Sequence, residues 1–231
     1  MKKCIVSYAD NTGHYQKGLN RLADSLRNVG FDGDLLLFTE PSQIGSPSHK
    51  EVPYAFKAHA IRTAIERDYD LILWCDSVIH ATRSVNPVFD HIENHGCLFF
   101  DNIGHNLGQW TSDACLKEHN MTREKAFKTP MIMACVMGFN MNDPDCIKFT
   151  DRYIAAASDG VSYPGSWTNE NKQVSENSKV KGHRHDQSVA SIIIDDMWLM
   201  ITIGQETYFA YEAHRGVVPI SDSVCLWSGG L

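Results

Sequence analysis

The first 75 residues alternate between short apolar runs and segments with helical periodicity, and this alternation constrains the fold more than any other feature. Three apolar runs have the length of buried strands, at residues 3–8, 34–39 and 71–75. Two segments between them, 15–29 and 56–65, carry apolar residues at helical spacing. A strand–helix–strand–helix–strand order is typical of a parallel sheet with right-handed crossovers. The sequence therefore predicts an α/β fold with a mostly parallel central sheet and helices on both faces.

The rest of the chain predicts further elements of the same kind. Asn86-Pro87 and Asp143-Pro144 each pair a capping residue with a first-turn proline, which indicates helices at 86–95 and 143–157. A third helix is expected from Asp186 to residue 194, with strands at 97–100, 131–140, 199–203 and 208–211. The polar segment 158–182 is typical of a mobile active-site loop. Because no linker or repeat separates these elements, we expect one domain over residues 1–231.

Composition and charge narrow the class of protein. The formal net charge is −7, and the sequence has no basic stripe of the kind that binds nucleic acid, so we expect no nucleic-acid partner. The N-terminus lacks a secretory signal, and no stretch approaches the roughly 20 apolar residues of a membrane span. The seven cysteines are scattered without a CxxC motif, which favours reduced, buried thiols over a disulfide framework. These features together predict a cytoplasmic protein without a membrane span.

Polar side chains follow three of the expected strands. Asp10 follows the first strand, Asp76 follows 71–75, and Asp101-Asn102 follow 97–100. In an open parallel sheet, ligands bind beyond the carboxyl ends of the strands, so these groups are expected to converge on one edge. Asp76 is the strongest candidate for a ligand-binding residue, because burying a carboxylate at a strand end costs free energy unless the carboxylate is paired or binds a metal. The alternative is structural, with Asp76 capping the turn that follows.

The segment Tyr69-Asp70-Leu71-Ile72-Leu73-Trp74-Cys75-Asp76-Ser77 resembles the strand and DxD motif of GT-A-fold nucleotide-sugar glycosyltransferases, of the small viral and bacterial type. Three other features match that family in the same order: Ala9-Asp10 before Tyr15, Lys57 in the helix before the Asp76 strand, and Asp186-Gln187 before the final helix. The resemblance spans most of the chain. It implies a glycosyltransferase of the hexosyltransferase type, which moves a sugar from a nucleotide-diphosphate sugar to a hydroxyl acceptor, expected to be a glycan or glycoconjugate.

The resemblance also assigns residues to the donor and its metal. It implies donor contacts from Tyr8, Ala9, Asp10, Thr12, Lys57, Asp76, Ser77 and Gln187, with Asp10 near the base or ribose and Lys57 near it. The family's DxD carboxylates hold Mn²⁺ or Mg²⁺ against the donor diphosphate, which makes Asp76 the expected metal ligand. Val78 replaces the second motif aspartate, so either another group completes the metal shell, or the metal is weakly bound, or none is needed. The candidate extra ligands are His80, His185 and His214, of which His214 resembles a late metal-binding histidine in some of these enzymes.

Asp186 and two tryptophans are the candidates for the acceptor side. Asp186 is either the N-cap of the last helix or the catalytic carboxylate that accepts the acceptor hydroxyl's proton, and His183 and His185 beside it favour the catalytic role. Trp110 and Trp167 lie in segments with Asn, Gln and Asp, which suits stacking on sugar faces. We therefore expect Trp110, Trp167 and His185 to contact the acceptor or sugar.

Three other functions remain as alternatives. His183-Arg184-His185-Asp186 contains an HxHD pattern that suits a metal-dependent hydrolase with zinc-activated water. A nucleotidyltransferase would share the sheet and the metal, but Asp10-Asn11-Thr12-Gly13 lacks the Gly-rich, basic loop that holds a triphosphate. A non-catalytic sugar-binding module would bind sugars without UDP or GDP.

Overall fold

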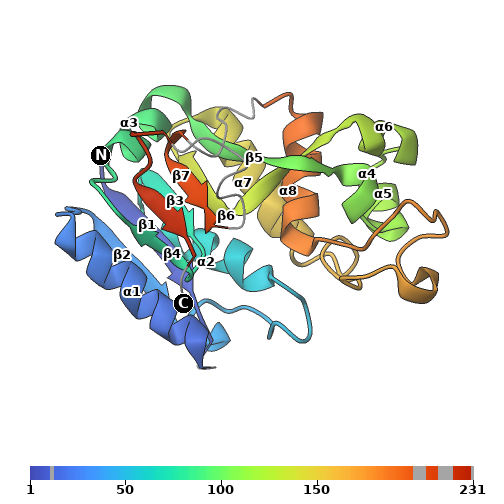
Figure 1. Cartoon of the computed structure of the whole chain (residues 1–231), viewed down its shortest axis with the longest axis horizontal. Helices are drawn as coiled ribbons and strands as arrows, with labels where there is room; N and C mark the ends of the chain where they lie inside the picture. The colour runs from blue at the N-terminus through green and yellow to red at the C-terminus, as the bar shows by residue number, and fades with distance from the viewer. Residues whose placement is uncertain (11–12, 200–206, 213–220, 230–231) are drawn as a thin grey trace.

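The computed structural model describes residues 1–10, 13–199, 207–212 and 221–229, and a five-stranded sheet lies at its centre (Figure 1). The strand order is β2-β1-β3-β6-β5, with bounds β1 Lys3–Tyr8, β2 Asp34–Phe38, β3 Leu71–Cys75, β5 Cys97–Asn106 and β6 Pro130–Asn140. Strand β1 pairs in parallel with β2 and β3, whereas β6 runs antiparallel to its neighbours β3 and β5. The sheet is mostly parallel, so the predicted α/β class is confirmed.

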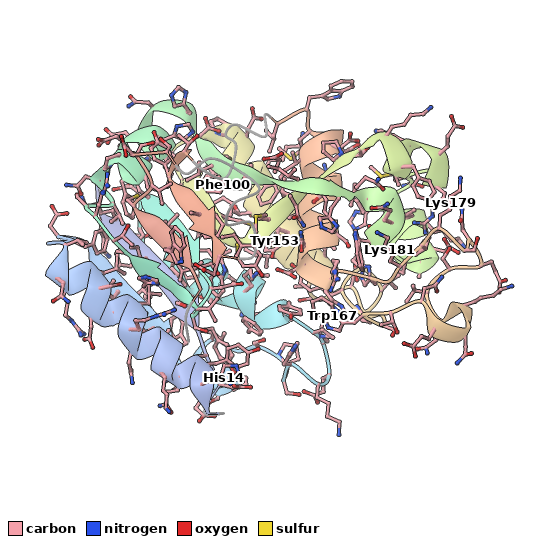
Figure 2. The ribbon with its side chains drawn as sticks, in the orientation of Figure 1. His14, Phe100, Tyr153, Trp167, Lys179 and Lys181 are labelled. Atoms are coloured by element: carbon pink, nitrogen blue, oxygen red, sulfur yellow. A yellow bond between two sulfur atoms is a disulfide. The ribbon has the colours of Figure 1, made fainter. Side chains whose placement is uncertain are left out.

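Helices cover both faces of this sheet, as the sequence predicted. Helices α2 (Ala55–Ile65), α7 (Pro144–Ala156) and α8 (His185–Asp196) share one core with Ile72 and Trp74 of β3. Helices α1 (His14–Asn28) and α3 (Asn86–His95) share the other core with Leu73 of the same strand. Tyr153 lies in the first core and Phe100 in the second. Figure 2 labels both side chains. The strand alternation thus separates two apolar layers, which is the arrangement of a sheet buried on both sides.

Local sequence explains where several elements begin. The Asp143 carboxylate accepts hydrogen bonds from the backbone N–H groups of Asp145 and Cys146, so the predicted cap of α7 is confirmed. At α3 the prediction is wrong by one residue, because Val85 is the N-cap and Asn86 and Pro87 lie inside the first turn. The last helix also differs: Arg184 is its N-cap and Asp186 lies in its first turn, so Asp186 does not cap the helix.

The segment after residue 100 is more structured than its polar composition indicates. Strand β5 continues to Asn106, and three short helices follow: α4 (Leu107–Trp110), α5 (Asp113–Glu118) and α6 (Arg123–Lys128). Their N-caps are Asn106, Ser112 and Thr122, and each side chain accepts a backbone N–H from its own first turn. Capping side chains of this kind stabilise short helices that lack a long apolar stripe.

A second, smaller sheet has the order β4-β8-β7, with bounds β4 Ile79–Ala81, β7 Phe209–Tyr211 and β8 Leu226–Ser228. Strand β7 falls within the predicted strand at 208–211, while β4 and β8 were not predicted. The predicted strand at 199–203 lies outside the described residues except for Leu199. Two single-turn 3₁₀ helices, η1 (Pro41–Gln43) and η2 (Glu170–Lys172), complete the described elements.

The cysteines correct one expectation from the sequence. Cys97 at the start of β5 and Cys146 in the first turn of α7 form a disulfide, whereas all seven thiols were expected to be reduced. The other five cysteines are free, and four of them are buried. Within the described part of the chain, no helix combines the length and apolar character needed to cross a membrane.

The polar segment 158–182 is a loop that folds back on itself. Its two arms are joined by backbone hydrogen bonds from His183 N–H to Ser166 O and from Asn169 N–H to Lys181 O. Gly182 lies between these bonds, and a Cβ atom at that position would stand 1.9 Å from the backbone oxygen of Trp167. The loop expected to be mobile is therefore tied to the fold next to Trp167, at a point where a side chain does not fit.

Gly182→Ala is expected to destabilise the protein by about 1–3 kcal/mol, because the new methyl group pushes the two arms apart. Urea unfolding followed by circular dichroism measures the change. Ser178→Ala in the same loop is the control, since Ser178 is exposed and its substitution is expected to change stability by less than about 0.5 kcal/mol. If Gly182→Ala costs no more than Ser178→Ala, the packing of these arms is not as close as described.

Candidate functional site

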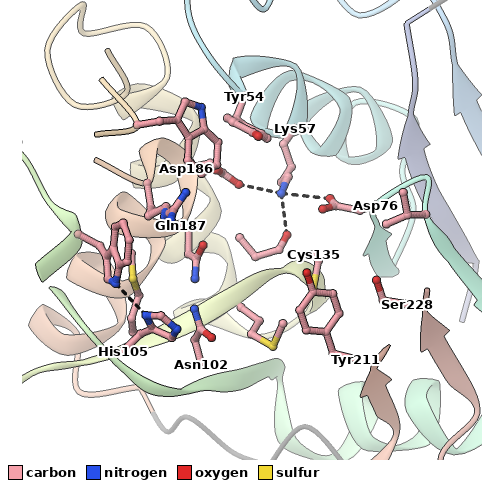
Figure 3. Close-up of a pocket in the computed structure, with 17 residues that line it drawn as sticks. Tyr54, Lys57, Asp76, Asn102, His105, Cys135, Asp186, Gln187, Tyr211 and Ser228 are labelled. Carbon is pink, nitrogen blue, oxygen red and sulfur yellow. Dashed lines mark hydrogen bonds and ion pairs between the residues drawn. The ribbon is translucent and has the colours of Figure 1, made fainter. Parts of the chain in front are cut away.

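A buried lysine joins two aspartates beyond the carboxyl end of β3 (Figure 3). Lys57 Nζ, from the first turn of α2, lies 2.7 Å from Asp186 Oδ2 and 3.2 Å from Asp76 Oδ1. The same ammonium group donates a hydrogen bond of 2.7 Å to the backbone oxygen of Ala134 in β6. The side chains of Lys57 and Asp186 are 3% and 6% exposed, whereas that of Asp76 is 33% exposed. Asp76 is thus the carboxylate of this cluster that solvent or a ligand reaches most easily.

Burial and charge act in opposite directions on this cluster. Burial lowers the pKa of Lys57, but Asp186 and Asp76 outweigh that effect and raise the pKa, which keeps the ammonium group charged. Burial raises the pKa of Asp186, and Lys57 only partly reverses that rise. Asp186 is therefore a stronger base than an ordinary aspartate.

Two contacts fix the position of Asp76, and a third fixes the turn that follows it. Trp74 Nε1–H donates a hydrogen bond of 2.8 Å to Asp76 Oδ1, and the backbone N–H of Asp76 donates to Cys135 O at 2.8 Å. Two residues later, the backbone oxygen of Val78 accepts a hydrogen bond from Arg21. The carboxylate is held on a buried strand end by groups from its own strand and from β6, which leaves little freedom for it to turn away.

Two cavities meet at Asp76. The smaller one, of about 310 Å³, is lined by Tyr8, Ala9, Asp10, Tyr15, His49, Phe56 and Ser77 together with three residues that it shares with the larger cavity. The larger one, of about 400 Å³, is lined by Lys57, Asn102, His105, Trp110, Met131, Met133, Ala134, Cys135, Trp167, Arg184, Asp186, Gln187, Tyr211 and Ser228. The shared residues are Tyr54, Asp76 and Val78. A ligand that extends through both cavities must therefore pass Asp76.

The residues singled out from the sequence divide between the cavities. Tyr8, Ala9, Asp10 and Ser77 line the smaller cavity, and Lys57, Trp110, Trp167, Asp186 and Gln187 line the larger one. Lys57 and Asp10 were expected side by side, but they line different cavities because the lysine reaches across to β6. Thr12 and His214 lie outside the described residues.

Asn102 and Gln187 reach the larger cavity from two further elements. Because β5 continues past Phe100, Asp101 and Asn102 lie within the strand rather than after it, and only Asn102 lines the cavity. Gln187 Nε2–H donates a hydrogen bond of 2.6 Å to Ile132 O of β6, which orients its side chain. Candidate ligand His80 lies on β4 and lines neither cavity.

His185 lies beneath the cavity wall instead of in it. Its ring is fully buried, its Nδ1–H donates to Tyr163 O at 2.8 Å, and the ring stacks on Tyr54 with centroids 5.5 Å apart. Trp167 packs edge-on against the same ring at 5.1 Å. His185 therefore supports Tyr54 and Trp167, and the expected contact between His185 and a sugar does not fit this position.

His183 uses both ring nitrogens within the protein. Its Nδ1 accepts the backbone N–H of Ser112 at 3.2 Å, so the proton is on Nε2, which donates to Ser162 O at 2.9 Å. No lone pair is left for a metal, which speaks against a hydrolase built on the HxHD pattern. In the described ranges, no three His, Cys, Asp or Glu side chains are grouped so as to hold a metal by themselves.

Comparison with known proteins identifies the fold. No protein-family model matches the chain, and no curated protein matches its sequence. A solved glycosyltransferase involved in the glycosylation of the major capsid of PBCV-1 is similar over 99% of this chain and 92% of its own, with a TM-score of 0.59 and 11% identity. The chain has a glycosyltransferase fold.

Two further structures support this glycosyltransferase fold. The bifunctional glycosyltransferase WbbM matches over 92% of this chain with a TM-score of 0.51 and 10% identity, and the match spans only 40% of WbbM. Mouse xyloside xylosyltransferase 1 matches over 98% of this chain and 96% of its own, with a TM-score of 0.50 and 10% identity. At such low identity the likeness concerns the GT-A-like fold and not the substrates.

Several residues that line the cavities were missed by the sequence analysis, among them Tyr54 and Arg184. Tyr54 precedes α2 in a left-handed conformation with φ of 63°, and it borders both cavities. No sequence signal marks it, because a tyrosine rarely adopts this conformation. Arg184 lies in the segment quoted for its histidines, where its charge was the available signal, but its contact with two tryptophans is visible only in the structure.

The buried state of His183 gives a stability prediction. Burial lowers its pKa from 6.5 to about 3, so between these pH values the unfolded chain binds a proton that the folded chain does not. Stability is therefore lost as pH falls below 6.5, by about 1.4 kcal/mol per pH unit for this one group. In His183→Gln, which does not titrate, the slope of unfolding free energy against pH between pH 4 and 6 is expected to be smaller by that amount.

Denaturant titrations at several pH values measure this slope. His14→Gln, at an exposed histidine, is the matched control for the loss of one histidine. An unchanged slope in His183→Gln would mean that the histidine is protonated in the folded protein or is not buried as described.

Proposed function

We propose that this glycosyltransferase-fold protein moves a sugar, of the hexose type, from a nucleotide-diphosphate sugar to a hydroxyl of a glycan or glycoconjugate. The observation that carries the proposal is the meeting of two cavities at Asp76, where Lys57 links that carboxylate to Asp186. A nucleotide sugar has two parts joined by a diphosphate, and a site for it needs two adjoining compartments. The fold supports the same class of reaction.

The smaller cavity suits the nucleoside. It lies at the end of β1 and is lined by aromatic rings of Tyr8, Tyr15, Tyr54 and Phe56, and Tyr8 stacks on Phe56 with centroids 4.5 Å apart. Aromatic faces pack against a nucleobase, and Asp10 supplies an acceptor for ribose hydroxyls or base N–H groups. We therefore assign the base and ribose to this cavity, with the diphosphate directed toward Asp76.

The residues around Asp76 are compatible with Mn²⁺ or Mg²⁺ bound together with the donor. Mg²⁺ usually keeps several waters and takes one or two carboxylates plus substrate phosphates, so a single exposed carboxylate is a sufficient protein contribution. Asp76, whose side chain is 33% exposed at the junction of the cavities, meets this need, while Val78 contributes only an apolar side chain. When bound, the cation would neutralise charge that develops on the diphosphate as it leaves.

The larger cavity suits the transferred sugar and the acceptor. During transfer, the bond from the anomeric carbon to the diphosphate oxygen breaks, and the diphosphate keeps the electron pair. A bond forms from the acceptor oxygen to the anomeric carbon, and the hydroxyl proton must go to a base. Asp186 and Asp76 are the acidic side chains among the described residues that line this cavity, and the raised pKa of Asp186 favours that carboxylate as the base.

Lys57 is assigned a positioning role in this scheme. Its ammonium group holds Asp186 at 2.7 Å through Oδ2, so the carboxylate is oriented before substrate binds. The Trp110 and Trp167 rings, which line the same cavity, provide apolar walls for the sugar rings of the acceptor. Gln187 is a hydrogen-bonding side chain for donor or acceptor hydroxyls.

Nucleotide binding is the first test of this function. A thermal-shift screen of UDP and GDP, with and without Mn²⁺, is expected to find one nucleotide that stabilises the protein, by about 2.7 kcal/mol at 100 times its Kd. Asp76→Asn is expected to remove the Mn²⁺-dependent part of that stabilisation and to lower turnover about 100-fold, because charge on the leaving group is no longer neutralised.

The matched control for Asp76→Asn is Asp90→Asn, at an exposed aspartate of α3 that lines neither cavity. Normal turnover by Asp76→Asn would refute the role of this carboxylate. Sugar binding without any nucleotide binding would instead favour a non-catalytic sugar-binding module.

Asp186→Asn tests the base. Removing the carboxylate is expected to lower kcat about 100- to 10,000-fold while nucleotide affinity stays near that of the unaltered protein. In the unaltered protein, kcat/KM is expected to fall as pH drops through the pKa of Asp186, which burial raises above the ordinary aspartate range. The residual activity of Asp186→Asn is expected to lack this acidic limb.

A profile of kcat/KM against pH, recorded with a sugar donor of the nucleotide that the thermal-shift screen identifies, measures this fall at low pH. Asp196→Asn is the matched control, because Asp196 ends the same helix on an exposed turn and pairs with Arg152. A loss of stability without a loss of kcat in Asp186→Asn would assign the carboxylate a purely structural role beside Lys57.

A further inference from the structure

Arg184 lies between the two tryptophans of the larger cavity. The centre of its guanidinium group is 4.0 Å from the ring centroid of Trp110 and 4.3 Å from that of Trp167. Its backbone is fixed as well, since its N–H group donates to Trp110 O at 3.0 Å. Both tryptophans line the cavity with it, and Trp110 is itself held by a 2.7 Å hydrogen bond from Nε1–H to His105 Nδ1. The arginine side chain is therefore clamped at the cavity wall.

The guanidinium group of Arg184 has no acidic partner among the described residues. The ion pairs in the described parts of the chain involve other basic residues, and within those parts the Arg184 side chain forms no hydrogen bond. Its partial burial lowers its pKa, which records the cost of taking this charge from water. The indole faces offset part of that cost through cation–π attraction. A cation in a cavity wall that meets no counter-charge among the described residues is well suited to bind an anion.

The two ring contacts also limit how an anion approaches. A guanidinium group carries its N–H donors in its plane. Aromatic rings that cover the faces of the group therefore leave the donors at its edges free to form hydrogen bonds. An edge with two parallel N–H groups matches two oxygens of a carboxylate, sulfate or phosphate. The expected ligand group is therefore an oxyanion of this kind, and a neutral hydroxyl would leave most of the donors unused.

The position of Arg184 separates it from the proposed diphosphate site. Arg184 lines only the larger cavity, whereas Asp76 lies where the two cavities meet. Trp110, which covers the guanidinium group, is bonded to His105, and Figure 3 shows His105 on the opposite side of the cavity from Asp76. We propose that Arg184 is a specificity residue that binds an oxyanion group on the acceptor, which makes the acceptor an acidic sugar.

The role of this ligand as the acceptor rests on the proposed function, but the binding of an oxyanion by Arg184 can be tested without catalysis. The probes are methyl β-D-glucuronide, methyl β-D-glucoside and methyl β-D-glucoside 6-sulfate, which share a ring and differ in charge. Binding is measured by NMR titration of the indole N–H signals, since Trp110 and Trp167 flank the arginine. The unaltered protein is expected to bind the glucuronide or the sulfate about tenfold more tightly than the glucoside.

Arg184→Gln is expected to abolish that preference, and Arg184→Lys to keep only part of it, because lysine retains the charge without the paired donors. Arg152→Gln is the matched control: it removes an arginine of α7 that lines neither cavity, and it is expected to keep the full preference. Equal binding of the three probes to the unaltered protein would overturn the proposal, whether or not the variants fold. So would a preference that persists in Arg184→Gln.

Nucleotide titrations distinguish an acceptor group from the donor's own phosphates. If Arg184 contacts the acceptor, then UDP, GDP and a nucleotide-linked acidic sugar, UDP-glucuronate, each bind Arg184→Gln as they bind the unaltered protein. A tenfold or greater loss of affinity for any of these three in Arg184→Gln, about 1.4 kcal/mol, would make Arg184 a donor residue and overturn the acidic-acceptor proposal. Failure of all nucleotides to bind the unaltered protein would refute the proposed function, whereas the glucuronide preference would still establish the anion site.

Discussion

The contact of Lys57 with Asp76 and Asp186 holds the site together. A buried ammonium group is stable only when nearby acceptors replace the water it has lost, and here two carboxylates and one backbone oxygen do so. Removing one partner of such a buried pair typically costs about 3–5 kcal/mol, because the other charge is left without compensation. Since Lys57, Asp76 and Asp186 come from α2, the end of β3 and α8, this one cluster sets how those three elements meet.

The reversed direction of β6 explains why the cluster forms where it does. An antiparallel strand brings its beginning to the edge at which the parallel strands end. Three carbonyl oxygens of β6 are thereby presented to the site: Ile132 O to Gln187, Ala134 O to Lys57 and Cys135 O to the backbone of Asp76. Backbone groups of a central strand are rigid acceptors, so side chains from α2 and α8 are aligned by the sheet itself.

The sequence was informative where a residue's role is decided by its neighbours in the chain. The apolar strand 71–75 and the cap at Asp143 follow local rules, and both are found as expected. The direction of β6, the disulfide and the contact of Lys57 with Asp186 depend on packing between distant segments, which periodicity does not encode. Asp186 illustrates the limit: its place near the start of a helix was recognisable, but its burial against a lysine from residue 57 was not.

The two positive groups of the larger cavity differ in what they still can bind. Lys57 already forms ion pairs with two carboxylates, so its charge is largely neutralised within the protein and serves to orient them. Arg184 meets aromatic faces, which attract its charge but do not use its N–H donors. In a chain with a net charge of −7, attraction of an acidic substrate from a distance is weak, and selection must occur by contact. A clamped guanidinium group provides such contact, since it has lost its freedom of rotation before the substrate arrives.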